Sequence, residues 1–265
     1  MKLPLIGLGT WDLRGKECTQ VVSQALDLGY HHIDTAHVYE NHTAIRKALK
    51  GRDRHKFYLT SKISLEQIDP KNVSSSVEKA CDLALHELGV DYLDLYLIHW
   101  PDRRFPLVEI FKSLEKLIEK KKIKHAGVSN FTIHHLRDLL DDGCKPFVNQ
   151  VEFHPYLYQK ELLDYCRLQR IELMAYRPLG KGVLLSEPLF KTIGLRYDKS
   201  PTQVILRWLV QQEISVITKT SSSKHLAENL AIFDFKLTSS EMEQIAKLHQ
   251  NKRFCLSKNW GDFDY

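Results

Sequence analysis

One pattern constrains the fold more than any other feature of the sequence. Short runs rich in β-branched and aromatic residues alternate with helix-length amphipathic segments along almost the whole chain. A strand followed by a helix, repeated in this way, predicts parallel strands, because each helix returns the chain to the same end of the sheet. Eight runs have strand character, at residues 5–10, 31–36, 57–63, 93–100, 125–130, 147–153, 172–179 and 215–220.

The segments between these runs carry helix signals. Gly29, Gly89 and Gly143 each follow an apolar periodic stretch, where a glycine can adopt the left-handed conformation that ends a helix. Two further helices are expected after the eighth run, at residues 222–230 and 238–250. The earlier helical segments are residues 18–29, 73–89, 107–122, 132–143, 159–169 and 200–213.

The chain shows no internal boundary. No linker rich in proline, glycine or serine interrupts the 265 residues, and the composition does not change along them. Eight strand–helix units therefore favour one closed (β/α)8 barrel, a TIM barrel, as a single domain over residues 1–265. An open doubly wound sheet is the alternative. In a barrel, active sites lie at the C-terminal ends of the strands, so the residues there indicate function.

Composition and charge exclude several other classes of protein. Hydrophobic residues make up 43% and charged residues 27%, and no apolar run reaches the roughly 18 residues of a membrane span. The N-terminus does not resemble a signal peptide, so we expect a cytoplasmic protein. The net charge of +5 is mild, and the basic run Glu119–His125 lies where a helix should end, which favours a solvated helix terminus over nucleic-acid binding. The five cysteines are scattered and are expected to be reduced thiols.

Polar residues are concentrated at the predicted C-terminal ends of the strands. Singly, Asp34 is explained as a turn residue, Lys62 as a rim lysine and His99 as a core histidine. Together they follow three consecutive strands, so a barrel would bring them close to one another. The full set at strand ends is Thr10, Asp34, Lys62, His99, Asn130, Gln150, Glu152, Tyr176, Arg177 and Lys219.

These residue types support proton transfer. Lys62 beside Asp34 forms an ion pair that offsets the cost of burying either charge. Tyr39, on the loop after Asp34, can reach the same place, and a phenol with an ordinary pKa of about 10 is protonated at neutral pH. We expect the neighbouring ammonium to lower that pKa, and we expect His99 to orient or polarise a carbonyl oxygen. The set suits carbonyl reduction or alcohol oxidation, which also needs a source of hydride.

A dinucleotide here would be bound without a Rossmann motif. The sequence GLG at Gly7–Gly9 is not GxGxxG, and we interpret it as a strand that requires close backbone approach. Ser129, Asn130 and Gln150 can instead hydrogen-bond a carboxamide.

Later strand ends offer the remaining cofactor contacts. The ring of Tyr176 offers a face for stacking. Lys219 lies just before a predicted helix whose N-terminus carries hydroxyl groups, an arrangement that suits a phosphate and favours NADPH.

The chain resembles the aldo-keto reductase family over essentially its whole length. Its short loops are similar to those of the small bacterial members, most of all the 2,5-diketo-D-gluconate reductase B type. Nine motifs carry the resemblance in order: GLGTW (7–11), HIDTAHVYEN (32–41), TSK (60–62), DYLDLYLIHWP (91–101), GVSNF (127–131), NQVEFHP (149–155), AYRPLG (175–180), ITKT (217–220) and AENLAIFDFKLT (227–238).

The resemblance implies roles for individual residues. It makes Tyr39 the general acid, Lys62 and Asp34 the pair that tunes it, and His99 the residue that orients the carbonyl. It implies that the 4-pro-R hydride of NADPH attacks the carbonyl carbon while Tyr39 protonates the oxygen. The implied cofactor contacts are Ser129, Asn130 and Gln150 to the carboxamide, Tyr176 to the nicotinamide ring, Arg177 and Leu179 nearby, Lys219 and Thr220 to the 2′-phosphate, and His225, Glu228 and Asn229 around the adenine. Trp11 and Trp100 are implied as aromatic walls of the substrate pocket.

Three departures from the family pattern bear on function. His225 stands where many members have an arginine, which weakens the expected preference for NADPH and leaves NADH use open. Arg177 replaces a common serine and should add a charge contact to the pyrophosphate. His42 and Arg46 replace the usual acidic residue and glycine after the tyrosine, so the chemistry of that loop should differ.

The sequence thus predicts an NADPH-dependent, monomeric reductase of aldehydes and activated ketones, with small 2-oxoaldehydes or keto sugars as plausible substrates and no nucleic-acid or membrane partner. A cofactor-binding regulatory protein with little turnover is the alternative. A metal-dependent hydrolase is disfavoured, and no metal site is expected. The best candidates for metal ligands, His31 and His32, are adjacent, and a strand would point their side chains to opposite faces.

Overall fold

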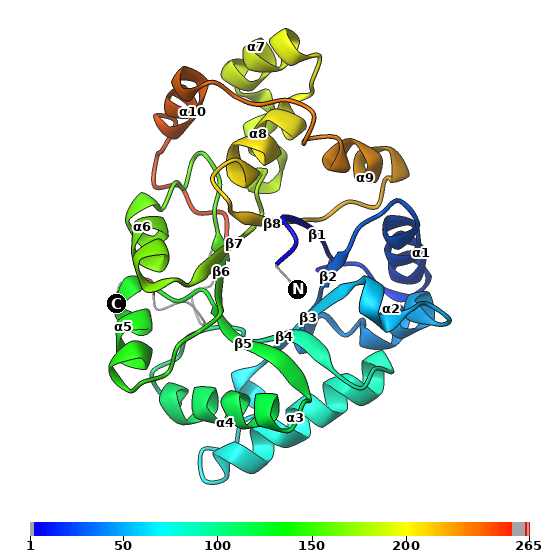
Figure 1. Ribbon diagram of the computed structural model, residues 1–265, viewed down its shortest axis with the longest axis vertical. Helices are drawn as coiled ribbons and strands as arrows, with labels where there is room; N and C mark the ends of the chain where they lie inside the picture. Colours follow the sequence, from blue (N-terminus) through cyan, green and yellow to red (C-terminus); the bar gives the residue numbers. More distant parts are fainter. Residues whose placement is uncertain (1–2, 256–262, 264) are drawn as a thin grey trace.

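The computed structural model describes residues 3–255 together with Phe263 and Tyr265. The extreme ends of the predicted domain, residues 1–2, 256–262 and 264, lie outside the described residues. Eight parallel strands close into a barrel in sequence order, and helices surround it (Figure 1). The first strand pairs with both the second and the eighth, so the predicted (β/α)8 barrel is confirmed and the open sheet is excluded.

Strands and helices alternate as the sequence pattern predicts. The strands are β1 (Ile6–Gly9), β2 (His32–Asp34), β3 (Tyr58–Ile63), β4 (Leu93–Ile98), β5 (Ile123–Ser129), β6 (Val148–Glu152), β7 (Glu172–Tyr176) and β8 (Ser215–Thr218). The α-helices are α1 (Gly15–Asp27), α2 (His42–Leu49), α3 (Val73–Leu88), α4 (Leu107–Glu119), α5 (Ile133–Asp141), α6 (Lys160–Gln169), α7 (Pro188–Tyr197), α8 (Pro201–Val210), α9 (Ser223–Leu230) and α10 (Ser239–Ala246). Short 3-10 helices are η1 (His37–Tyr39), η2 (Arg54–Lys56), η3 (Leu65–Gln67) and η4 (Gly180–Ser186).

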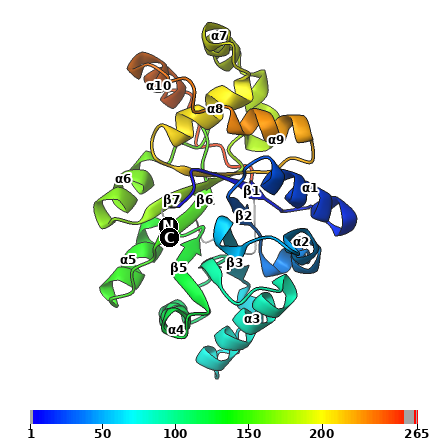
Figure 2. The same cartoon turned by 45° about the vertical axis from the view of Figure 1, so that its right-hand side comes forward.

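The main differences from the predicted elements are at their ends. β7 was expected to continue to residue 179 but ends at Tyr176, because Arg177 adopts a left-handed backbone with φ of 51°. Helices α2 and α7 were not among the predicted segments, although α7 begins with Pro188, a residue favoured in the first turn. Helices α7 and α10 both lie outside α8, farther from the barrel (Figures 1 and 2).

Apolar side chains fill the barrel and the layer between strands and helices. The set inside the barrel consists of Leu3, Tyr58, Leu95, Leu97, Val148, Met174 and Ile217. Glycine is required where β1 meets this set, since a Cβ on Gly7 or Gly9 would lie 2.8 or 2.7 Å from Ile217. This close approach confirms the structural interpretation of the GLG sequence.

The basic run after α4 forms surface ion pairs. Lys120 and Lys122 contact the carboxylate of Glu78 at 2.7 and 2.9 Å, and Lys122 also contacts Asp82 at 2.6 Å. Residues 119–122 of the run are therefore the solvated helix terminus that was predicted, whereas residues 123–125 begin β5. No helix in the described part of the chain is both long and apolar enough to cross a membrane.

Strand register decides which polar residues share one end of the barrel. Asp34 is level with Gly9 on β1 and with Thr60 on β3. Ser129 on β5 is level with Gln150 on β6. Because all eight strands are parallel, these residues at their C-terminal ends surround one mouth.

Candidate active site

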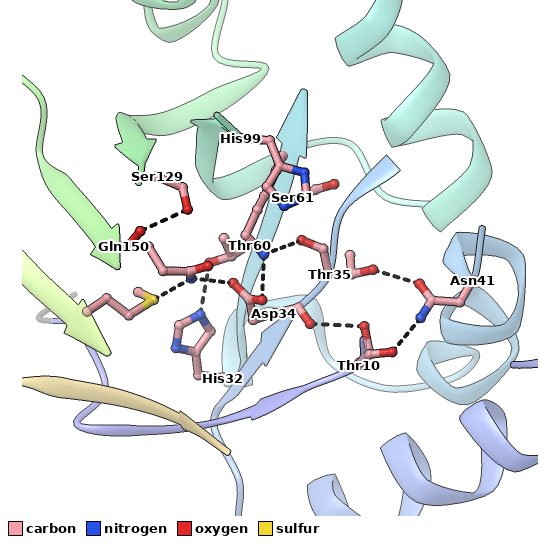
Figure 3. Close-up of polar contacts among 12 residues, drawn as sticks. Thr10, His32, Asp34, Thr35, Asn41, Thr60, Ser61, His99, Ser129 and Gln150 are labelled. Carbon is pink, nitrogen blue, oxygen red and sulfur yellow. Dashed lines mark hydrogen bonds and ion pairs between the residues drawn. The ribbon is translucent and has the colours of Figure 1, made fainter. Parts of the chain in front are cut away.

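A buried ion pair lies at the centre of the mouth. Nζ of Lys62 donates to Oδ1 of Asp34 at 2.6 Å and to the carbonyl oxygen of Thr35 at 2.9 Å, and the Lys62 side chain is only 1% exposed. Oδ2 of Asp34 accepts a hydrogen bond from Nε2 of Gln150 at 2.7 Å (Figure 3). The pair predicted from adjacent strand ends is thus present and hydrogen-bonded on both sides, which offsets the cost of its burial.

The loop after β2 brings Tyr39 to this pair. The Tyr39 ring centroid is 5.2 Å from Nζ of Lys62. Asn41 holds the loop in place, because its amide accepts from Oγ1 of Thr35 at 2.7 Å and donates to the carbonyl oxygen of Thr10 at 2.8 Å (Figure 3). Sequence reasoning did not assign Asn41 to the site, although an asparagine shortly after a predicted strand is a recognisable turn signal.

The expected effect of Lys62 on the phenol needs correction. Burial raises the pKa of Tyr39 above its usual value, and this outweighs the lowering by the Lys62 ammonium, while the Asp34 charge raises the pKa further. The prediction that the pKa of Tyr39 would fall is therefore wrong for the free site. Because its pKa is raised, Tyr39 is protonated at neutral pH and able to donate a proton.

His99 completes the group at the end of β4. Its ring packs edge-on to that of Tyr39, with centroids 5.8 Å apart, and its carbonyl oxygen accepts from Nδ2 of Asn130 at 3.0 Å. Burial, together with the nearby Lys62 charge, holds the pKa of His99 well below its usual value. A neutral imidazole carries one N–H, which can donate to a carbonyl oxygen. Among the described residues, Nδ1 of His99 has no hydrogen-bond partner.

A cavity of about 570 Å³ opens at this mouth. The predicted site residues that line it are Trp11, Asp34, Tyr39, His99, Trp100, Ser129, Asn130, Gln150, Tyr176, Arg177, Leu179 and Lys219. Lys62 lies behind this lining. Sequence reasoning did not assign to the site its other lining residues, Gly9, Val38, Pro178, Lys181, Gly182, Ile217, Thr218 and Cys255.

The residues expected to hold a carboxamide form one hydrogen-bonded group. Oγ of Ser129 donates to the carbonyl oxygen of Gln150 at 2.8 Å and accepts from Nδ2 of Asn130 at 3.1 Å. The hydroxyl of Tyr176 donates to Oδ1 of Asn130 at 2.7 Å. The group is preorganised, and the half-buried Tyr176 borders the cavity as expected for a stacking residue.

Among the described residues, three cations line the cavity. Lys219, exposed just beyond β8, and Arg177 were predicted, whereas Lys181 follows a glycine in the loop after β7 and was missed. The guanidinium of Arg177 lies 5.3 Å from the ring centroid of Trp11 and donates to the carbonyl oxygen of Phe254 at 3.1 Å. Arg177 is thus held by neighbours in the free protein.

The residues predicted to contact adenine and phosphate lie on or beside α9. Ser222 caps this helix, its Oγ accepting the backbone N–H of His225 at 3.4 Å. His225 is exposed, and Thr220 and Glu228 are half-buried. Asn229 is 3% exposed, and among the described residues its Oδ1 has no hydrogen-bond partner. A buried acceptor without a partner is costly, so this atom fits a ligand that carries an amine donor.

Aromatic rings form the outer wall. Trp100 stacks on His99 with centroids 6.2 Å apart, and Phe263 packs edge-on to Trp100 at 6.0 Å. Trp11 is 50% exposed at the rim. At the start of β2, His31 is exposed and His32 is buried, in keeping with the opposite faces expected for adjacent strand residues.

Comparison with known proteins gives a consistent result. The model of the aldo/keto reductase family matches residues 5–250. Glyoxal reductase of Bacillus subtilis is 41% identical over 257 residues, covering 96% of this chain and 91% of the relative. The 9,11-endoperoxide prostaglandin H2 reductase of Trypanosoma cruzi is 38% identical over 261 residues, with coverage of 96% and 90%.

Solved structures agree with the expected fold. MGS-M4, an aldo-keto reductase from a Medee basin deep-sea metagenome library, superposes with a TM-score of 0.93 at 34% identity, covering 100% of this chain and 97% of its own. A structure assigned as a 2,5-diketo-D-gluconic acid reductase B has a TM-score of 0.93 at 33% identity, with coverage of 98% and 92%. This neighbour supports the resemblance to that type noted from the motifs.

Proposed function

Because this chain belongs to the aldo/keto reductase family, we propose that its cavity reduces aldehydes and activated ketones to alcohols with NADPH as the reductant. The protein is an oxidoreductase that acts on carbonyl and alcohol groups and uses a nicotinamide cofactor, as the family does. The observation that carries the proposal is the convergence of Tyr39, His99 and the buried Lys62–Asp34 pair on one mouth.

Proton donation belongs to Tyr39. Its phenol is protonated at neutral pH, so it can donate to a carbonyl oxygen on which negative charge develops during reduction. The Lys62 ammonium favours the phenolate that remains, and it acts more strongly in a buried site than it would in water. Asp34 keeps Lys62 in position and charged, which its 2.6 Å contact supports.

His99 orients the substrate. A neutral imidazole N–H directed at the carbonyl oxygen fixes the carbonyl without adding a full charge to the cavity. His99 and Tyr39 pack edge-on with ring centroids 5.8 Å apart, so we assign both side chains to the same oxygen.

The residues along the later strands fit a nicotinamide dinucleotide. When bound, this cofactor supplies the hydride that the carbonyl carbon accepts. We assign Ser129, Asn130 and Gln150 to its carboxamide and Tyr176 to its ring. The unpartnered Oδ1 of Asn229 suits the exocyclic amine of adenine.

Preference for NADPH rests on charge at the end of β8. Lys219 lines the cavity beside Thr220, and Arg177 and Lys181 add two further cations for phosphate groups. We assign Lys219 and Thr220 to the 2′-phosphate, Arg177 and Leu179 to the region of the pyrophosphate, and His225 and Glu228 to the rim of the adenine site. His225 is a weaker anion partner than arginine, so NADH should remain usable.

Small dicarbonyl substrates suit this cavity best. About 570 Å³ must accommodate the nicotinamide as well as the substrate, between the walls formed by Trp11 and Trp100. The relative from Bacillus subtilis is a glyoxal reductase. We therefore propose small 2-oxoaldehydes, with keto sugars next, and a monomeric cytoplasmic enzyme whose single domain spans residues 1–265.

The decisive experiment replaces Tyr39 by phenylalanine. Phenylalanine keeps the ring and loses the proton, so turnover of methylglyoxal should fall by about two to four orders of magnitude. Quenching of intrinsic fluorescence by NADPH should be retained, because Tyr39 is not assigned to the cofactor. Wild-type turnover in this variant would refute the assignment. Wild-type protein that binds NADPH but reduces nothing in a panel of aldehydes, ketones and keto sugars would favour the regulatory alternative.

A further inference from the structure

The chain returns to the barrel mouth after α10. Residues 250–255, which we call the C-terminal strap, lie against β6 and the loop that follows it. The backbone N–H groups of Gln250 and Lys252 donate to the carbonyl oxygen of Tyr156 at 3.1 and 3.0 Å. The last residue of the strap, Cys255, lines the cavity. The strap is therefore part of the cavity wall, although it is far from the other lining residues in sequence.

The strap is held by both oxygens of one carboxylate. Glu152, the last residue of β6, is 0% exposed. Its Oε1 accepts the backbone N–H of Phe254 at 2.7 Å, and its Oε2 accepts that of Cys255 at 2.7 Å. Glu152 is not among the described residues that line the cavity, and its side chain meets the cavity wall at the strap.

A third donor fixes the carboxylate. The backbone N–H of Leu157 donates to Nδ1 of His154 at 3.1 Å, so Nδ1 is unprotonated and Nε2 carries the proton. That N–H therefore donates to Oε1 of Glu152 at 3.0 Å. In the described part of the chain, no lysine or arginine forms an ion pair with Glu152. Burial alone would raise the pKa of Glu152, but the hydrogen bonds from His154, Phe254 and Cys255 outweigh it and leave the pKa below its usual value.

One peptide group of the strap bridges two opposite charges. The peptide that joins Phe254 to Cys255 donates its N–H to Glu152 and accepts at its carbonyl oxygen from Nη1 of Arg177 at 3.1 Å. The Phe254 ring also packs closely over Gly180, where an added Cβ would lie 2.7 Å from the ring. The position of Arg177, a cation that lines the cavity, is thus coupled to the strap.

From these contacts we infer that Glu152 is a positioning residue, which holds the C-terminal strap against the barrel mouth. It thereby determines the position of the cavity wall near Cys255 and of the Arg177 side chain. A buried carboxylate that lost the two N–H groups of the strap would be left largely unsatisfied. Release of the strap is therefore strongly opposed while Glu152 is ionised. The kinetic consequence rests on the proposed reductase function, whereas the position of the strap can be measured independently of it.

The strap carries its own reporter. Cys255 is the partly exposed cysteine, whereas Cys18, Cys81, Cys144 and Cys166 are buried. Burial raises the pKa of Cys18, Cys81 and Cys166 to about 12, so these thiols react slowly. Iodoacetamide labelling of the folded full-length chain, followed by mass spectrometry, should thus report on Cys255. Loss of that label in Cys255→Ser would identify the labelled thiol.

The test is Glu152→Gln, which keeps the shape but supplies one acceptor oxygen where two N–H groups need acceptors. We expect alkylation of Cys255 to become about tenfold faster or more, because charge-assisted hydrogen bonds are lost. We expect KM for methylglyoxal to rise several-fold more than kcat falls, since the wall moves while Tyr39 and Lys62 stay in place. If the wild-type protein has no reductase activity but Cys255 is alkylated faster in Glu152→Gln, the proposed function is overturned and the positioning role of Glu152 is supported.

A matched control separates positioning from loss of stability. Asp94, 2% exposed near the start of β4, also accepts a backbone N–H, that of Leu59 at 2.9 Å, but lies toward the other end of the barrel. Asp94→Asn should lower the melting temperature without changing the alkylation rate or KM. Equal effects of the two variants, or unchanged alkylation and KM in Glu152→Gln, would overturn the inference.

A second variant tests the same bond from the strap. Phe254→Pro removes the N–H that Oε1 of Glu152 accepts, and it also loses the ring that packs over Gly180 and against the core. It should accelerate Cys255 alkylation even where Glu152→Gln fails to fold. An unchanged rate in Phe254→Pro would count against Glu152 as the anchor.

Discussion

Replacing Lys62 by methionine would remove the buried cation on which the ion pair depends. In the wild type, Nζ lies 2.6 Å from Asp34 and 2.9 Å from the Thr35 carbonyl oxygen, at 1% exposure. The variant would leave a buried Asp34 carboxylate with the amide of Gln150 as its remaining described side-chain donor. Breaking one half of such a pair costs about 3–5 kcal/mol of folding free energy. For a chain of this size, that corresponds to a melting temperature lower by about 6–20 °C.

The same substitution should lower turnover by a different route. Without the ammonium, the main effects left on the pKa of Tyr39 are its burial and the charge of Asp34, and both raise that pKa. Tyr39 is then a weaker acid toward the carbonyl oxygen on which negative charge develops. We expect kcat to fall by about two to four orders of magnitude, the usual contribution of general acid catalysis.

A double variant distinguishes the two effects. Asp34→Asn combined with Lys62→Met removes the unpaired charge, so it should recover part of the lost stability without recovering turnover. Thermal unfolding measures the first quantity and consumption of NADPH the second. A Lys62→Met protein that melts within about 2 °C of the wild type and turns over within about tenfold of it would refute this reasoning.

Three further predictions concern His42, Arg177 and Asn229. His42 contacts Glu87 at 2.9 Å, and burial, partly opposed by that carboxylate, lowers the pKa of His42. As the pH falls, the unfolded chain therefore takes up this proton before the folded chain does. The free energy of unfolding should fall below about pH 6.5 by at most about 1.4 kcal/mol per pH unit. Urea unfolding across pH should show a shallower fall for His42→Gln, and equal slopes would contradict this. Arg177→Ser should raise the NADPH Kd by about tenfold, as a charge-assisted hydrogen bond is lost, and an unchanged Kd in fluorescence titration would count against the pyrophosphate contact. Asn229→Leu removes a buried acceptor without a partner, so it should raise the melting temperature of the free protein while weakening NADPH binding; a variant that does neither would refute the adenine assignment.

Local patterns were enough to predict the architecture and the polar residues that gather at the barrel mouth. Strand and helix periods come from side chains a few residues apart, so eight units could be recognised without long-range information. The barrel rule then directed attention to strand ends, where Asp34, Lys62 and His99 were found, and the structure brings them together with Tyr39.

The ends of strands and helices and the local pKa values were harder to predict from the sequence. The left-handed backbone of Arg177 shortened β7, and no periodic signal reports a single φ angle. The pKa of Tyr39 was predicted to fall because the charge of its neighbour was visible in the sequence, whereas the degree of burial was not. Burial is a property of the packed molecule, and here it outweighs the neighbouring ammonium.

By itself, the sequence determined a barrel, a mouth lined by polar residues and a family, because each depends on residue types at short, regular spacings. The tertiary structure alone decided that the last described part of the chain returns to that mouth, that Glu152 holds it, and that Cys255 and Lys181 line the cavity. These contacts join residues about a hundred positions apart, from β6 to Cys255. No local pattern encodes them, since they arise only when the folded barrel presents a buried carboxylate to the returning strap.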